Sequence, residues 1–168
     1  VVSPSFYEIT ASGDIDANIG VDGKNYIEWA HANGYKVWPM VSNSELGDLD
    51  AMSKILEKFE TRGYLIENIV SELIEAGVDG VNIDFENMYQ EDKENFSRFL
   101  IELAPRLHEA GLTLSVDVTA PDGSETWSLC YDRNTIGKVA DYIIFMGYDQ
   151  NGPSSTEAGT VAGANWVE

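Results

Sequence analysis

Short runs rich in β-branched residues alternate along the chain with longer segments in which apolar residues recur at helical spacing. The first pattern is typical of buried strands and the second of amphipathic helices. We therefore predict five strands, over residues 1–9, 36–42, 78–85, 112–119 and 142–148. The predicted helices cover residues 25–33, 50–59, 64–76, 91–110 and 134–140, with a break at Arg62–Gly63 and a loop after Gly152.

Regular alternation of strands and helices indicates the α/β class, with a parallel sheet. The 168 residues are enough for one ordinary domain with a buried core. Because no shift in composition marks a linker, we predict that residues 1–168 form part of a single domain.

Polar and apolar residues alternate without exception over the third predicted strand, from Val81 to Glu86. Alternation places Asn82, Asp84 and Glu86 on one face, about 6.6 Å apart at two residues per repeat. Such a face is often simply the solvated side of an antiparallel sheet. Strands joined by helices are usually buried on both faces, so here the polar row is expected to line a barrel interior or a cleft. Asp79, at the amino end of the strand, is expected to bind neighbouring backbone instead.

Two carboxylates on one buried face repel each other, which raises the pKa of at least one of them. Glu86 stands at the carboxyl end of its strand, where parallel-sheet folds carry their active sites. A carboxyl that keeps its proton near neutral pH can deliver it to a leaving oxygen. The row therefore predicts a general acid at Glu86.

Charge and composition exclude several other functions. Lys and Arg number 10 against 29 Asp and Glu, for a formal net charge of −19, so we expect neither nucleic acid nor an anionic membrane as a partner. The single cysteine, Cys130, excludes an intrachain disulfide. Residues 14–18 begin like a calcium loop but lack the glycine at the sixth position and the glutamate at the twelfth. We expect no metal and no cofactor.

Residues 79–86, DGVNIDFE, closely resemble the active-site signature of glycoside hydrolase family 18, the chitinases and related N-acetylglucosaminidases. Residues 145–149, FMGYD, resemble the second landmark of that family, at the end of its sixth barrel strand. The segments VSPSFYEI, KVWPMVSN, LSVDVTAP and AGANWVE are similar to the spore-associated branch that attacks cortex peptidoglycan.

This resemblance implies a (β/α)8 TIM barrel, present here only over about strands two to six. Strands one, seven and eight are absent from the sequence, and we expect a longer parent chain to supply them. Five strands cannot close an eight-stranded barrel and should leave two unpaired edges. The resemblance also implies a secreted, cell-wall or spore-associated location.

The resemblance further implies roles for individual residues. Glu86 would be the general acid and base, Asp84 would orient and stabilise the reacting acetamido group, and Tyr148 would hydrogen-bond that group's carbonyl. Asn82 stands where many chitinases have Asp, which predicts a shifted pH profile. The expected substrate-binding residues are Asp149, Met146, Asn82, Asp117 and Trp127, and Asp117 is also expected to lie beside Asp84.

The predicted function is a retaining glycoside hydrolase that cleaves β-linked, N-acetylglucosamine-containing glycan, either peptidoglycan or chitin-like. The substrate's 2-acetamido group, rather than a second carboxylate, would act as the nucleophile, an exception to the usual scheme. The alternative is a non-catalytic, lectin-like protein of the same fold. The partner is a polysaccharide or oligosaccharide in either case, and the particular glycan, the endo or exo mode and the oligomeric state remain open.

Overall fold

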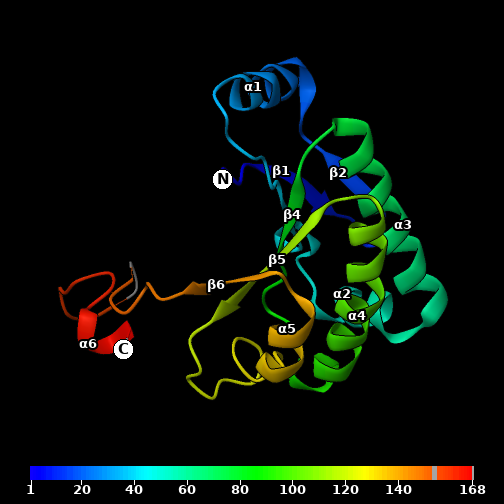
Figure 1. Cartoon of the computed structure of the whole chain (residues 1–168). Helices are drawn as coiled ribbons and strands as arrows, with labels where there is room; N and C mark the ends of the chain where they lie inside the picture. Colours follow the sequence, from blue (N-terminus) through cyan, green and yellow to red (C-terminus); the bar gives the residue numbers. More distant parts are fainter. Residues whose placement is uncertain (153–154, 168) are drawn as a thin grey trace.

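The computed structural model describes residues 1–152 and 155–167, which form one six-stranded sheet in the order β2-β1-β3-β4-β5-β6 (Figure 1). Strands β1, β3, β4, β5 and β6 are parallel, and β2 pairs antiparallel with β1. The strands are β1 (Ser5–Ile9), β2 (Ile15–Ala17), β3 (Met40–Ser42), β4 (Gly80–Asp84), β5 (Thr113–Thr119) and β6 (Tyr142–Met146). The five predicted strands are confirmed, and β2 is an additional strand that the hydrophobic pattern did not predict.

Helices connect the parallel strands, and α3 and α4 lie along one side of the sheet (Figure 1). No helix among the described residues is long and apolar enough to cross a bilayer. The helices are α1 (Gly20–Ala32), α2 (Leu49–Glu57), α3 (Phe59–Ala76), α4 (Lys93–Glu109), α5 (Arg133–Val139) and α6 (Ala164–Val167), with short 3₁₀ turns η1 (Ser44–Leu46) and η2 (Gln90–Asp92). Helix α6 lies in the segment predicted to be a loop.

The strand order identifies the architecture. Each parallel strand lies beside the next parallel strand in the sequence, whereas a doubly wound sheet reverses its order at a switch point. The sheet is not closed, because β2 and β6 are its edges. The four residues Tyr142 to Phe145 of β6 are accordingly 41–57% exposed. This arrangement is the partial barrel, with two open edges, that the sequence predicts.

The two faces of β4 differ as its alternating sequence predicts. Val81, Ile83 and Phe85 are at most 1% exposed, and the Phe85 ring stacks on Phe99 of α4 at 5.4 Å between centroids. Gly80 is required by the close approach of β5, since a Cβ there would lie 2.6 Å from the carbonyl oxygen of Thr113. The outer face therefore anchors β4 to the helices, which leaves its polar residues on the barrel interior.

The predicted helix break at Arg62–Gly63 is wrong, because α3 runs from Phe59 to Ala76 without interruption. The break lies at Lys58, between α2 and α3. The Arg62 side chain is buried, donates to the Leu56 carbonyl at 2.8 Å and pairs with Glu102 at 2.7 and 3.1 Å. These long-range contacts outweigh the cost of a glycine in a helix, about 1 kcal/mol.

Candidate active site

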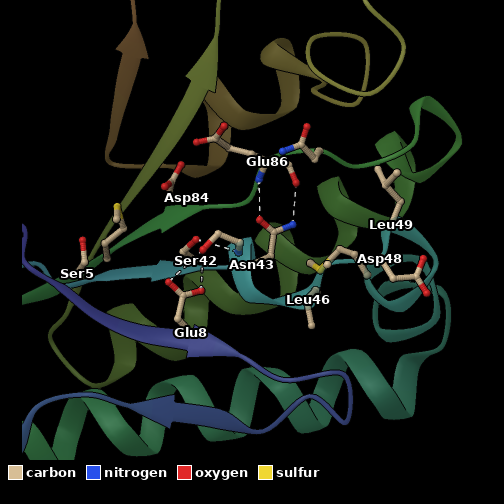
Figure 2. Close-up of a pocket in the computed structure, with 14 residues that line it drawn as sticks. Ser5, Glu8, Ser42, Asn43, Leu46, Asp48, Leu49, Asp84 and Glu86 are labelled. Carbon is tan, nitrogen blue, oxygen red and sulfur yellow. Dashed lines mark hydrogen bonds between the residues drawn. The ribbon is translucent and has the colours of Figure 1, made fainter. Parts of the chain in front are cut away.

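Two cavities meet at Glu86, beyond the carboxyl ends of the strands. The larger is about 580 Å³ and is lined on its polar side by Glu8, Ser42, Asn43, Asp84 and Glu86 (Figure 2). The smaller is about 200 Å³ and is lined by Glu86, Ala120, Asp122, Trp127, Met146, Tyr148 and Asp149. Among the described residues only Glu86 borders both cavities, so its carboxyl lies where a bound molecule could extend to either side.

The electrostatics of Glu86 suit an acid that is protonated near neutral pH. Burial raises the pKa of Glu86 to about 7, and the negative charge of Asp84, a hydrogen bond to that carboxyl and the charges of Asp117 and Asp149 add to this shift. The pKa of Asp84 is also raised by burial, while the hydrogen bond from Glu86 lowers it. Glu86 can therefore hold a proton near neutral pH, with the Asp84 carboxyl as its hydrogen-bond partner.

Two neighbouring elements hold the backbone of Glu86. Asn43, directly after β3, donates from Nδ2 to the Glu86 carbonyl at 2.7 Å and accepts from the Glu86 amide at 2.9 Å (Figure 2). On the other side, the Tyr131 hydroxyl donates to the Phe85 carbonyl at 2.8 Å. Asn87 then adopts a left-handed conformation, with φ of 51°, which asparagine tolerates better than most residues. The acid is thus fixed on a segment tied from both sides.

Asn82 and Asp117 form a buried network behind Asp84. The Asn82 Nδ2 donates to Asp117 Oδ2 at 2.8 Å, and the Ser115 hydroxyl donates to Asn82 Oδ1 at 2.8 Å. Burial raises the pKa of Asp117 to about 6; the hydrogen bond from Asn82 lowers it, and the charge of Asp84 raises it. Asn82 is 2% and Asp117 7% exposed, and neither lines the two cavities.

The other residues singled out from the sequence gather around the smaller cavity. Trp127, Met146, Tyr148 and Asp149 all line it together with Glu86. Burial and four nearby carboxyl groups raise the pKa of Tyr148, so its hydroxyl remains a donor at neutral pH. Asp149 has φ of 68°, a left-handed conformation that turns the chain directly after Tyr148.

The structure places at the site three residues that are not among the predicted site residues, namely Asn43, Tyr131 and Glu8. Asn43 directly follows Ser42, which pairs with Asp84 of β4 at the end of β3. The position of Asn43 at a strand end is the one sequence feature that points to a place at the site. Tyr131 lies in a loop 46 residues from its partner Phe85, and no local pattern could reveal that contact. Glu8 pairs with Ser42 across β1 and β3 and lies in the larger cavity, within 3.3 Å of the Ser44 hydroxyl.

A carboxyl with a pKa near 7 beside a second carboxyl, at the carboxyl ends of the strands of a partial barrel, is an arrangement suited to acid-assisted hydrolysis. Glycosidases are the type case, in which one acid protonates the leaving oxygen and a neighbouring anion offsets the positive charge that develops on the sugar. Residues 5–165 match the model of glycosyl hydrolases family 18. The chain belongs to this family, and both sequence landmarks lie at the site.

Relatives and solved structures agree with this assignment. The chain is 28% identical over 157 residues to an uncharacterized glycosylase, YvbX, of Bacillus subtilis. That match covers 89% of this chain and 45% of YvbX. It is 30% identical over 122 residues to the cortical fragment-lytic enzyme of Bacillus anthracis. That match covers 68% of this chain and 28% of the enzyme. A crystal structure of a chitinase from Chromobacterium violaceum ATCC 12472 superposes with a TM-score of 0.87 at 30% identity. The superposition covers 99% of this chain and 53% of the chitinase. The chain thus spans about half, or less, of each of these proteins.

Proposed function

We propose that the protein is a retaining glycoside hydrolase that cleaves β-linked glycan containing N-acetylglucosamine, of the peptidoglycan or chitin type. The observation that carries the proposal is the carboxyl of Glu86, whose pKa is raised to about 7 beside Asp84. Glu86 also lies between two cavities that extend to either side of it. An acid in that position can reach the oxygen that joins two sugars.

In the first step, Glu86 gives its proton to the glycosidic oxygen as the bond from that oxygen to the anomeric carbon breaks. The acetamido carbonyl oxygen of the same sugar attacks the anomeric carbon and forms a cyclic oxazolinium ion. The ionised Asp84 offsets the positive charge of this ion, and the Tyr148 hydroxyl donates to the acetamido oxygen.

In the second step, Glu86 is a carboxylate and takes a proton from a water molecule, which attacks the anomeric carbon and reopens the ring. Two displacements at one carbon leave its configuration unchanged, and Glu86 regains its proton. The cycle needs no second carboxylate as nucleophile, which fits an Asp84 that lies beside Glu86 rather than across a sugar from it.

The charge of the cavities supports an uncharged, N-acetylated sugar as the substrate. Among the described residues that line the two cavities there are carboxylates but no Lys or Arg. The carboxylates are Glu8, Asp48, Asp84, Glu86, Asp122 and Asp149. Carboxylates accept hydrogen bonds from sugar hydroxyl and amide groups but repel an anionic sugar. The names of the relatives, a chitinase and a cortical fragment-lytic enzyme, support the two glycan types proposed.

The test is hydrolysis of chitin oligomers and of cortex peptidoglycan by the complete protein and its Glu86→Gln variant, with products identified by mass. We expect turnover to fall about 10³-fold in the variant, since general acid catalysis contributes about 10²–10⁴-fold, while glycan binding is kept. Glu91→Gln, an exposed glutamate on η2, is the matched control and should keep full activity. Unchanged hydrolysis by Glu86→Gln would overturn the assignment of the acid.

Two further readouts separate the mechanism from the activity. Newly formed products should carry the β configuration of the substrate, observed by NMR before mutarotation. A substrate without the 2-acetamido group should not be cleaved, and equal hydrolysis of such a substrate contradicts the acetamido nucleophile. Wild-type protein that binds the glycans without turnover supports the lectin-like alternative, which the presence of Glu86 disfavours.

A further inference from the structure

Glu8 is a carboxylate in the larger cavity to which the proposed reaction gives no role. It lies on β1, where its register partner is Ser42 of β3, and Ser42 in turn pairs with Asp84 of β4. The three residues form a row across three neighbouring strands, and all of them line the cavity (Figure 2). Because neighbouring strands lie about 4.8 Å apart, the backbone of Glu8 lies about 10 Å from that of Asp84. Glu8 can therefore face a neighbouring sugar rather than the reacting one.

The end of β3 orients the Glu8 side chain. The Ser42 hydroxyl accepts from the Ser44 amide at 3.1 Å, and the Ser44 hydroxyl lies 3.3 Å from each carboxylate oxygen of Glu8 (Figure 2). That hydroxyl has a single proton to donate. The ion pairs of the described residues do not include Glu8. The carboxylate is thus held in place but keeps most of its capacity to accept hydrogen bonds.

The other carboxylates of the larger cavity have partners of their own. Asp84 and Glu86 are hydrogen-bonded to each other. Asp48 caps α2, because its side chain accepts from the Asp50 amide at 3.0 Å. Glu8 is the remaining carboxylate among the described residues that line this cavity, and its hydrogen-bond partner Ser44 lines the cavity as well. A sugar bound there would meet Glu8 as an available acceptor.

The proposed mechanism decides which sugar Glu8 can meet. The acetamido group of the reacting sugar is expected at Tyr148, which lines the smaller cavity and not the larger one. A second sugar in the larger cavity is then a neighbouring unit, whose own substituents take no part in the reaction and are free to vary. Apolar side chains of this cavity can pack against the ring of that unit, namely Met40, Leu46, Leu49 and Met52. Selection among the substituents is left to the polar lining, with Glu8 at its centre.

We infer that Glu8 is a specificity-determining residue, which makes the larger cavity accept an uncharged or amine-bearing glucosamine unit and reject a unit that carries a carboxylate. Hydroxyl, amide and ammonium groups can donate to Glu8. A carboxylate, such as the free lactyl group of muramic acid, has no proton to donate and is repelled, and no Lys or Arg among the described lining residues offsets that repulsion. The inference rests on the proposed function for the placement of the reacting sugar. It narrows the substrate to glycan without a free carboxylate beside the cleaved bond.

The test compares three kinds of N-acetylglucosamine tetramer as substrates of the complete protein. One is fully acetylated, one has a free amine in place of a single acetamido group, and one carries a lactyl carboxylate on a single unit, with the changed unit placed at each position in turn. Product masses identify the unit on each side of the cleaved bond. For wild type, kcat/KM should be about five- to tenfold lower when the carboxylate lies in the unit next to the reacting sugar, and should not be lowered by an amine there.

Variants of Glu8 assign this selection to one side chain. Glu8→Gln removes the charge, so the ratio of kcat/KM between the acetylated and the carboxylate-bearing tetramers should shrink about fivefold. Glu8→Asp keeps the charge and should keep most of the wild-type ratio. Glu45→Gln is the matched control, since Glu45 is an exposed glutamate of η1 that lines neither cavity. An unchanged ratio in Glu8→Gln, or an equal change in Glu45→Gln, overturns the inference.

A binding measurement separates this inference from the proposed function. Calorimetric Kd values of the three tetramers should follow the same order in Glu86→Gln protein, and the added Glu8→Gln change should narrow that order. If wild type cleaves no glycan but binding depends on the charge of the sugar and on Glu8, the proposed function fails and the role of Glu8 stands. If glycans are cleaved but neither kcat/KM nor Kd distinguishes the tetramers, the proposed function stands and the role of Glu8 fails.

Discussion

The two ends of the sheet use aspartate in opposite ways. At the amino ends, Asp79 Oδ2 accepts from the Val37 amide at 2.8 Å and lies 2.8 Å from His31 Nε2. Asp141 Oδ2 likewise accepts from the Leu114 amide at 2.8 Å and lies 2.9 Å from His108 Nε2. Each contact joins the end of a helix to the starts of two strands, and the backbone role expected for Asp79 is confirmed.

At the carboxyl ends the same residue type lacks such partners. Burial raises the pKa of Asp141, but the Leu114 amide and His108 outweigh it and leave this pKa lowered. Asp84 and Asp117 instead each keep one buried oxygen that no described residue bonds, and the pKa values of both are raised. The comparison teaches that partners decide whether a carboxylate stabilises the fold or remains reactive, as expected for barrels whose amino ends carry stability and whose carboxyl ends carry catalysis.

The largest effect that tests this contrast is expected from Asp84→Asn. Removing the anion that faces the developing oxazolinium should lower kcat by about 10²–10³-fold, comparable to the loss of one electrostatic stabilising group. Thermal stability should not fall, because a buried charge is removed. The matched change at the other end, Asp79→Asn, should leave kcat within about twofold. A normal rate for Asp84→Asn on acetylated substrates contradicts its catalytic role.

A smaller loss is expected from Asn43→Ala, which removes both hydrogen bonds to the backbone of Glu86. The acid keeps its chemistry but loses its fixed position, so we expect kcat to fall about tenfold with little change in KM. Steady-state kinetics measures this split. An exposed asparagine on α5, Asn134→Ala, serves as the control, and equal losses in the two variants would show that Asn43 has no specific role.

The stability of the protein should depend on pH through Glu86. Its pKa is about 7 in the folded state against the ordinary 4.5, so the folded state binds the proton more tightly than the unfolded state. The resulting stability is fully present below about pH 4.5 and is lost as the pH rises to about 7. Calorimetric melting curves at pH 5 and pH 8 should show a smaller difference for Glu86→Gln than for wild type. An identical difference contradicts the raised pKa.

The smallest expected effects concern the amino ends. Asp79→Ala leaves the buried Val37 amide without an acceptor, and Asp141→Ala does the same to Leu114. Each should cost about 1–3 kcal/mol of unfolding free energy, with kcat unchanged at temperatures where the variant is folded. Urea denaturation measures the loss. If either variant lowers kcat as strongly as Asn43→Ala, the division of roles between the two ends is wrong.

The sequence predicts the parts of this molecule that depend on local pattern. The alternation from Val81 to Glu86 gives the polar face correctly, and apolar spacing gives the main strands and helices. It fails where distant contacts decide the outcome: Arg62 keeps α3 continuous through its pairing with Glu102, and β2 exists because it pairs with β1. The supports of Glu86 from Asn43 and Tyr131 likewise join segments that no short window of sequence connects.

The Asn82–Asp117 hydrogen bond has an evolutionary consequence. Asparagine and aspartate codons differ by a single base, so two point mutations exchange the acid and the amide between β4 and β5. An intermediate with two acids adds a third carboxyl to Asp84 and Asp117, and one with two amides removes the titrating neighbour of Asp84. Either intermediate alters the acidity of the site before the second mutation occurs, so neighbouring lineages that differ at these two codons would work best at different pH.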